Sequence, residues 1–241
     1  MRTHMSTRKI FALIGALLIA AVTFAQQAKT DFTLVDKAYR SASSLSMQVA
    51  YNLYATHESA VLHSKQKGFY KKKGKLQLAE VAGVETLWKE NMTVVCDKNN
   101  RLIVLANPVK TINQAFQLDI DTLLKLCSKV SYDETAAQKK YRLEFAKTPY
   151  SEYTAIEVSI NKSSWMVDKL VLFYRQARAL DVSKPQHKTQ PRLEIVYSEV
   201  KKDIELSSEE FSENRYIETK RGKTVCADAY SAYRFVNQKN R

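Results

Sequence analysis

Cysteine, histidine, glycine and proline are all scarce in this chain of 241 residues, which contains three, four, five and four of them respectively. Three cysteines are too few to build a small disulfide scaffold, and an odd number leaves at least one unpaired. Cys96, Cys127 and Cys226 form no CxxC pair, so neither a redox motif nor a zinc knuckle is indicated. One disulfide is allowed in an oxidising compartment, but the sequence does not select its partners.

Familiar catalytic and metal-binding patterns are missing as well. His57, His63 and His187 do not stand in a recognised metal spacing with a carboxylate or a cysteine. The chain has no GxSxG, no HExxH and no glycine-rich phosphate loop. The paired carboxylates Glu209 and Glu210 fall in a polar acidic run, where their pKa values would not be raised by burial. We therefore expect a protein that is not an enzyme and that uses neither a cofactor nor a metal.

Residues 1–25 are typical of a secretory signal peptide. A basic start, "MRTHMSTRK", precedes the apolar run "IFALIGALLIAAVTF", and Ala25 is the small residue expected at a cleavage site. The alternative, a membrane anchor, is disfavoured because a spanning helix needs about 20 apolar residues. The sequence thus predicts cleavage near Ala25 and one exported domain over residues 26–241.

The chain is strongly basic, with a net charge of +13. Export argues against genomic nucleic acid as the partner, so we expect no nucleic acid. A basic surface outside the cytoplasm fits anionic headgroups or an acidic protein, although solubility alone would also explain it. The densest run is "KQKGFYKKKGKLQL", in which Lys71, Lys72 and Lys73 are expected at a hairpin turn. They are interpreted either as a solvated tip or as a contact for a headgroup or partner.

The hydrophobic period changes early in the chain. Residues 30–44 show helical spacing, whereas residues 45–53 alternate apolar and polar side chains as a strand does. Short strands then follow at about 61–70, 75–81, 84–89, 92–97, 101–106, 129–132, 140–146, 153–161, 166–175 and 193–200, with a helix at 120–128. The pattern predicts a mainly β (α+β) fold: an open, curved antiparallel sheet, or half-barrel, covered by a few helices.

Several strands are apolar on both faces, as in "MTVVC", "LIVLA" and "LVLFY". One face would pack on helices or on the core. The other would belong either to a two-sided core or to an apolar cavity for a hydrophobic ligand.

The order of these elements resembles the periplasmic lipoprotein carrier and outer-membrane lipoprotein receptor family (LolA/LolB-like). The similar pieces are "KGFYKKKGKLQL", "GVETLWKENMTVVCDKNN", "RLIVL" and the later hairpin "YTAIEVSINKSSWMVDKLVLFYR". The chain departs from the family's pattern in "LAEVAGVE", which has neither arginine nor proline, and in the additional end "KTVCADAYSAYRFVN".

The resemblance implies a periplasmic, non-enzymatic carrier that holds lipoprotein acyl chains or another hydrophobic ligand. Lysines at the mouth could then hold an anionic headgroup. The alternative is a structural or assembly subunit of a cell-envelope complex that uses the same sheet for protein contacts. The residues expected to line the cavity are Met47, Val49, Tyr51, Phe69, Leu76, Leu78, Trp88, Val94, Leu102, Val104, Ile156, Val158, Leu170 and Leu172.

Overall fold

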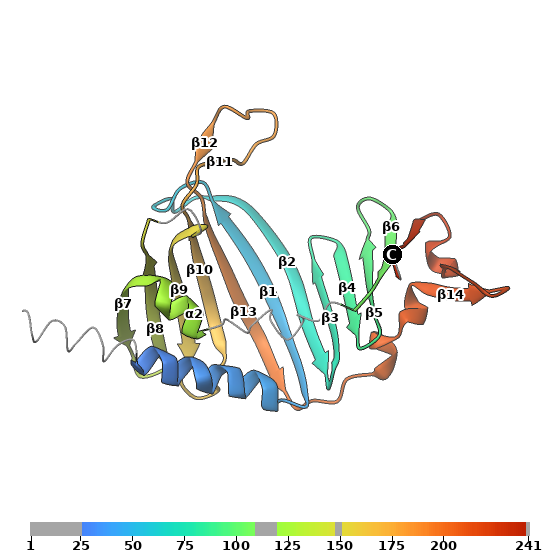
Figure 1. Cartoon of the computed structure of the whole chain (residues 1–241), viewed down its shortest axis with the longest axis horizontal. Helices are drawn as coiled ribbons and strands as arrows, with labels where there is room; N and C mark the ends of the chain where they lie inside the picture. The colour runs from blue at the N-terminus through green and yellow to red at the C-terminus, as the bar shows by residue number, and fades with distance from the viewer. Residues whose placement is uncertain (1–25, 109–119, 148–150, 240–241) are drawn as a thin grey trace, which may run out of the picture. The chain divides into compact units, whose positions relative to one another are not determined.

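The computed structural model describes residues 26–108, 120–147 and 151–239, and the predicted signal peptide lies outside them. Twelve strands form one sheet in the order β16-β6-β5-β4-β3-β2-β1-β13-β10-β9-β8-β7 (Figure 1). Strands β16 and β7 stand at the two ends of this order, so the sheet is open and does not close into a barrel. The predicted fold class, mainly β with an open antiparallel sheet and few helices, is confirmed.

The elements have the following bounds. The strands of the large sheet are β1 (Ser44–Tyr54), β2 (Leu62–Lys73), β3 (Leu76–Val81), β4 (Val84–Lys89), β5 (Met92–Asp97), β6 (Leu102–Ala106), β7 (Cys127–Glu134), β8 (Gln138–Phe145), β9 (Tyr153–Asn161), β10 (Val167–Tyr174), β13 (Arg192–Lys202) and β16 (Arg234–Asn237). The small hairpins are β11 (Arg178–Ala179) with β12 (Lys188–Thr189), and β14 (Ile217–Lys220) with β15 (Lys223–Cys226). The helical elements are a helix over residues 26–41, α2 (Ile120–Leu126), and the 3-10 turns η2 (Ser208–Phe211), η3 (Glu213–Arg215) and η4 (Asp228–Tyr230).

Most predicted strands are present, and three have the predicted bounds: β4, β5 and β9. The lysine run is a correction. Lys71–Lys73 belong to β2, and the turn is made by Gly74 and Lys75, with Gly74 at φ 57°. Glycine adopts this left-handed conformation without steric cost, so the strand extends to the residue before it. The two predicted helices also end earlier than expected, at residue 41 and at Leu126, where strand pairing takes over.

The chain forms two compact units, of which unit 1 contains residues 26–39, 54–61 and 120–193 among those described. In unit 1 the leading helix packs on β8. The ring centroids of Phe32 and Tyr141 are 5.3 Å apart, and buried Asp31 accepts hydrogen bonds from Lys139 Nζ (2.7 Å) and Tyr141 Oη (2.5 Å). Register shifts interrupt the regular pairing in the β7–β8 and β9–β10 ladders of this unit.

Unit 2 contains residues 40–53, 62–108 and 194–239 among those described. Strands β2 to β6 form an antiparallel meander, joined by turns such as "DKNN", where Asp97 Oδ1 accepts from the backbone N–H groups of Asn99 and Asn100. The last described strand, β16, pairs in parallel with β6. Parallel pairing requires a long connection, and here residues 107–233 separate the two strands, with residues 203–233 leading from β13 to β16.

Gly68 in β2 is buried against the backbone of β3, where an added Cβ atom would meet the carbonyl oxygen of Glu80 at 1.9 Å. Backbone atoms cannot yield as a flexible side chain can, so Gly68→Ala should lower the free energy of unfolding by about 1–3 kcal/mol. Lys67→Ala, at the exposed neighbouring position, should change it by less than about 0.5 kcal/mol. Urea unfolding of both variants tests this, and equal midpoints would contradict it.

Candidate functional site

The two faces of the β3–β6 meander differ in what covers them. Cross-strand pairs place six side chains on one face, here called the covered face, and all are at most 5% exposed. They are Leu78, Leu87, Val94, Cys96, Ile103 and Leu105. Because they are apolar and almost inaccessible, they form a filled core on this side of the sheet.

Residues 203–233, here called the C-terminal crossover, seal the covered face. Its side chains Leu206, Phe211, Tyr216 and Ile217 are buried in the same cluster as Leu87. Phe211 and Tyr216 are each 1% exposed and are among the largest fully buried side chains of the described residues. The aromatic side chains Tyr230, Tyr233 and Phe235 also pack against this cluster.

The lysine run attaches the crossover to the sheet. Lys71 forms an ion pair with Glu210, and Lys73 Nζ donates to Leu206 O (2.7 Å) and Ser208 Oγ (2.9 Å). From the opposite face of β2, Lys72 Nζ donates to Ala42 O (3.1 Å), and burial lowers the pKa of Lys72. These side chains are half-buried and bind the chain's own groups, so the picture of a solvated hairpin tip is wrong.

A buried carboxylate connects the covered face to the crossover. The Glu85 side chain is 4% exposed, accepts a hydrogen bond from Tyr216 Oη, and lies 2.8 Å from Arg215 Nη2 and 3.3 Å from Lys98 Nζ. Burial raises the pKa of Glu85, but the Tyr216 hydrogen bond and the two cations outweigh it and hold the pKa below its usual range. Burial is the larger cause that raises the pKa of Tyr216, and the hydrogen bond to Glu85 raises it further.

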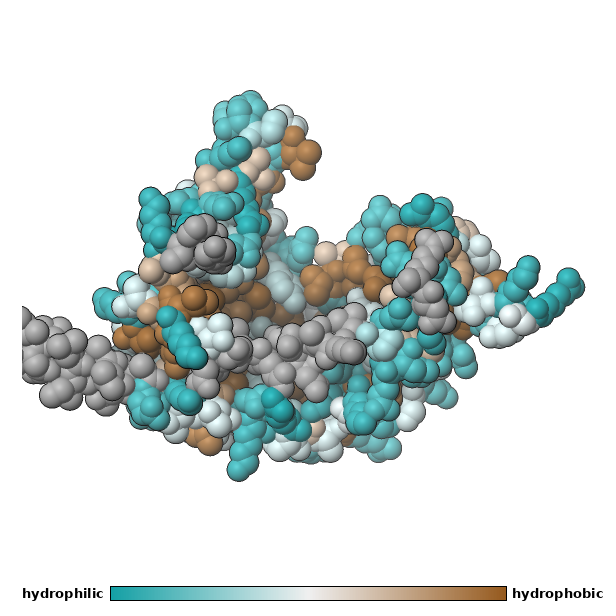
Figure 2. All heavy atoms as spheres, viewed as in Figure 1, coloured by the Kyte–Doolittle hydropathy of each residue, from teal (hydrophilic) through white to brown (hydrophobic). Residues whose placement is uncertain are grey.

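The opposite side of the meander, here called the open face, is apolar but only half-buried. The ladder Thr86–Val95–Val104–Val236 crosses four neighbouring strands on this side. The apolar side chains on the open face include Ala79, Val81, Val84, Trp88, Val95, Leu102, Val104 and Val236, and each retains intermediate exposure. Figure 2 shows hydrophobic side chains at the surface over β3 and β4. At one end Trp88 stands between Gln77 and Thr93, which are 5% and 4% exposed.

The structure divides the predicted lining residues of unit 2 between these faces. Trp88, Leu102 and Val104 lie on the open face. Four others lie on the covered face, where the C-terminal crossover fills the space: Phe69, Leu76, Leu78 and Val94. In β1, Met47 and Val49 are buried and Tyr51 is half-buried. The residues predicted from the sequence did not include Ala79, Val81, Val84, Val95 and Val236. These residues alternate along their strands with the covered residues, and that alternation would have assigned them to the opposite face.

In unit 1 the predicted residues share one face. Leu170 pairs with Val158 and Leu172 with Ile156, and β8 continues the row with Tyr141 and Leu143. Ile156 and Val158 are buried, whereas Leu170 and Leu172 keep intermediate exposure. This is the face that the leading helix contacts through Tyr141.

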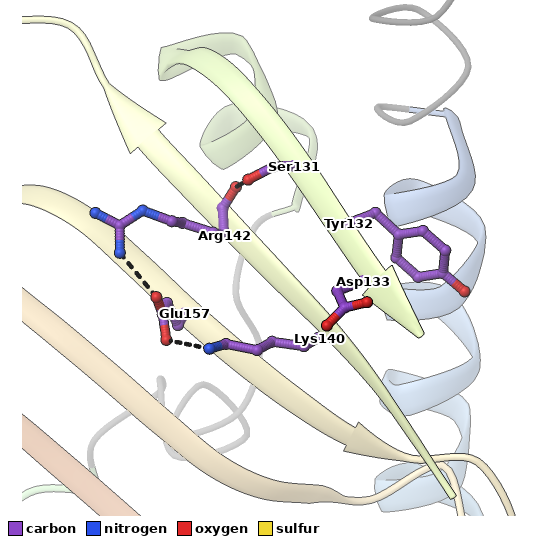
Figure 3. A pocket seen from close by; sticks show the side chains of 6 residues that line it. All are labelled: Ser131, Tyr132, Asp133, Lys140, Arg142 and Glu157. Carbon is purple, nitrogen blue, oxygen red and sulfur yellow. Dashed lines mark hydrogen bonds and ion pairs between the residues drawn. The ribbon is translucent and has the colours of Figure 1, made fainter. Parts of the chain in front are cut away.

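The other face of unit 1 carries a charged hollow lined by Ser131, Tyr132, Asp133, Lys140, Arg142 and Glu157 (Figure 3). Glu157 pairs with Lys140 (2.9 Å) and with Arg142 (2.7 Å). Burial raises the pKa of Glu157, but these two cations outweigh it and hold the pKa below its usual range. Arg142 also stacks over Phe173, 4.8 Å from its ring centroid. The cations of the hollow are therefore held by groups of the protein itself.

Other chemistry in the described residues is limited. The three cysteines are free thiols, and burial raises the pKa of Cys127 to about 11, which makes it a poor nucleophile at neutral pH. Within residues 26–108, 120–147 and 151–239, no cluster of three or more histidine, cysteine or acidic side chains could hold a metal ion. None of the helices described there is both long and apolar enough to cross a membrane.

Comparison with known proteins finds similar solved structures but no match in sequence. No family model and no curated protein matches the chain. One similar solved structure is an uncharacterized conserved protein from Thermus thermophilus, with a TM-score of 0.47, 10% sequence identity and coverage of 89% of this chain and 99% of that one. The Mycobacterium tuberculosis lipoprotein LppX has a TM-score of 0.41 at 9% identity, covering 76% of this chain and 98% of its own. A LolA superfamily protein from Nitrosomonas europaea has a TM-score of 0.35 at 12% identity, covering 78% of this chain and 98% of its own.

Proposed function

We propose that the protein is an exported, periplasmic, non-enzymatic carrier that binds an acyl chain or another hydrophobic ligand on its sheet. The observation that carries the proposal is the open face of unit 2, whose apolar side chains remain half-buried while the other face of the same strands is sealed. The LolA/LolB-like resemblance supports the choice of lipoprotein acyl chains as the ligand.

The energetic argument concerns the exposed apolar area. Burial of one methylene group is worth about 0.8 kcal/mol, so an acyl chain lying along Val95, Val104 and Trp88 would gain affinity from each carbon that leaves water. No charged side chain interrupts the ladder Thr86–Val95–Val104–Val236, so the ligand would desolvate no ion there. A flexible, unbranched hydrocarbon suits a sheet face whose apolar residues are spaced along several strands.

The test uses Trp88 as a reporter, since the chain has two tryptophans and Trp165→Phe removes the other. Fatty acids brominated on the acyl chain should quench Trp88 fluorescence in a saturable manner. Val95→Asp in this background should weaken binding by about tenfold or more, because the ligand would then bury a carboxylate. Val182→Asp, the same change at a position that is 95% exposed, should leave binding unchanged.

Two outcomes would count against the proposal. One is the absence of Trp88 quenching at every lipid concentration, and the other is full affinity of Val95→Asp with an unchanged circular dichroism spectrum. Native mass spectrometry of the gently extracted protein distinguishes the carrier from the alternative, a subunit of a cell-envelope complex. Retained lipid supports the carrier, whereas a lipid-free protein with one bound envelope partner supports the subunit.

A further inference from the structure

Strand β2 is longer than its neighbour β3, and its first half has an open edge. The β2–β3 ladder begins at the pair Gly68 and Val81, so residues 62–67, here called the β2 edge, run on past the turn that joins β3 to β4 (Figure 1). Among the described strands, β2 has only β1 and β3 as neighbours. All six residues of the β2 edge are exposed, and at about 3.3 Å per residue they span about 20 Å. An edge of this length can pair with one more strand.

The hydrogen-bond directions along β2 identify the residues that present this edge. Gly74 N donates to the carbonyl oxygen of Ser43, the residue before β1, at 2.8 Å. Even-numbered residues of the strand therefore turn their backbone groups to β1. Directions alternate along a strand, so odd-numbered residues turn theirs to the β3 side, as Lys73 does at the two-residue turn. Beyond the end of β3, His63 and Lys65 thus direct their backbone N–H and C=O groups outward.

The side chains of the β2 edge carry charge of one sign. Lys65 and Lys67 share one face of the strand with His63, because alternate side chains point the same way. The edge contains no acid, and neither of its lysines forms an ion pair within the described part of the chain. Lys71, farther along the same face, pairs with Glu210 of the C-terminal crossover. One half of β2 therefore binds an acid of the chain itself, and the other half offers the same chemistry to a partner.

We propose that the β2 edge binds an extended acidic segment of a partner protein as an additional antiparallel strand. Two residues of the segment, at positions i and i+2, would exchange backbone hydrogen bonds with Lys65 and His63. Acids at these positions would stand directly opposite the basic side chains and on the same face. The residue between them would lie on the other face, beside Leu62 and Ser64, which are both exposed. Acids alternating with β-branched residues therefore match the edge.

Other occupants fit the β2 edge less well. In an antiparallel pair with a second copy, an axis at Lys65 opposes the two Lys65 side chains, and an axis at Gln66 opposes Lys65 and Lys67 twice. No register between two such edges provides an attractive ion pair, because the edge has no acid. A lipid headgroup or a nucleic acid would meet the lysines but has no regular row of backbone donors and acceptors. An acidic peptide satisfies both the charges and the backbone.

The test uses a short, capped, fluorescently labelled peptide of alternating valine and glutamate, with fluorescence anisotropy as the measure of binding to the purified protein. Binding should be saturable and should weaken as the salt concentration rises. A peptide of alternating valine and lysine should not bind. Lys65→Glu should raise the Kd by about tenfold or more, because a repulsion replaces an attraction. The matched control Lys201→Glu changes an exposed lysine of β13, which has strand neighbours on both sides, and should leave the Kd unchanged.

Methylation of the peptide nitrogens distinguishes strand pairing from charge attraction alone. N-methylation of the glutamates removes the N–H groups that would donate to the carbonyl oxygens of His63 and Lys65, so it should abolish binding. N-methylation of the valines alters only the far side of the added strand and should preserve binding. The proposal is overturned if the glutamate peptide does not bind or if both methylated peptides bind equally. It is also overturned if Lys65→Glu, with an unchanged circular dichroism spectrum, keeps full affinity.

Discussion

Replacing Phe211 by alanine is expected to lower the free energy of unfolding of unit 2 by about 3–5 kcal/mol. Phe211 is 1% exposed and packs in the cluster of the covered face, which includes Leu78, Leu87 and Val94. Its removal would lose the transfer free energy of the ring and leave a cavity between the crossover and the sheet. Hence the crossover should release the covered face at much lower urea concentration.

Trp88 fluorescence in the Trp165→Phe background is the appropriate measurement, because Trp88 belongs to unit 2 and Trp165 to unit 1. Phe235→Ala serves as the control, since Phe235 packs on the same cluster but is only half-buried, and its loss should cost clearly less. If Phe211→Ala unfolded at the wild-type midpoint, the crossover would not be a structural part of unit 2.

The second large effect concerns Glu85. Glu85→Ala would leave Tyr216 Oη buried without its acceptor and Arg215 without its ion pair, at a cost of about 3 kcal/mol. Glu85→Gln keeps an acceptor oxygen and the side-chain shape, so its effect should be smaller. Urea unfolding at neutral pH should rank the variants as wild type, Gln and Ala in order of falling stability.

The same carboxylate should make unit 2 sensitive to acid. The folded-state pKa of Glu85 lies below its usual range, so the unfolded chain takes up a proton at higher pH than the folded one. The stabilisation is therefore complete above the ordinary glutamate pKa and is lost as the pH falls through the lower folded-state pKa. Unfolding midpoints of wild type and Glu85→Gln should converge in that acidic range, and a constant difference down to low pH would contradict this origin.

Local patterns predicted much of the sheet because they have local physical causes. Period-two alternation over residues 45–53 located β1, since alternate side chains of a strand point to opposite faces, and short apolar runs between turn residues in "GVETLWKENMTVVCDKNN" located β4 and β5. The turn at "DKNN" also has a local cause, because Asp97 accepts hydrogen bonds from the two residues that follow Lys98. The lysine run was misplaced because the left-handed Gly74, rather than charge, ends β2.

The candidate site was predictable only in part. Alternation assigns Trp88 and Val104 to one face and Leu78 and Val94 to the other, but it does not say which face stays open. That choice depends on Phe211 and Tyr216, which are far from β5 in the chain and carry no local sign of their packing partners.

By itself the sequence determined the mainly β fold class, the positions of most strands and the scarcity of catalytic chemistry, because each depends on residue type and near-neighbour spacing. Only the tertiary structure decided that the C-terminal crossover fills one side of the meander and leaves the other half-exposed. It also decided that Lys71 and Lys73 bind the chain's own crossover. The physical reason is that long-range burial and charge pairing are set by which distant segments meet, and periodicity holds no information on that.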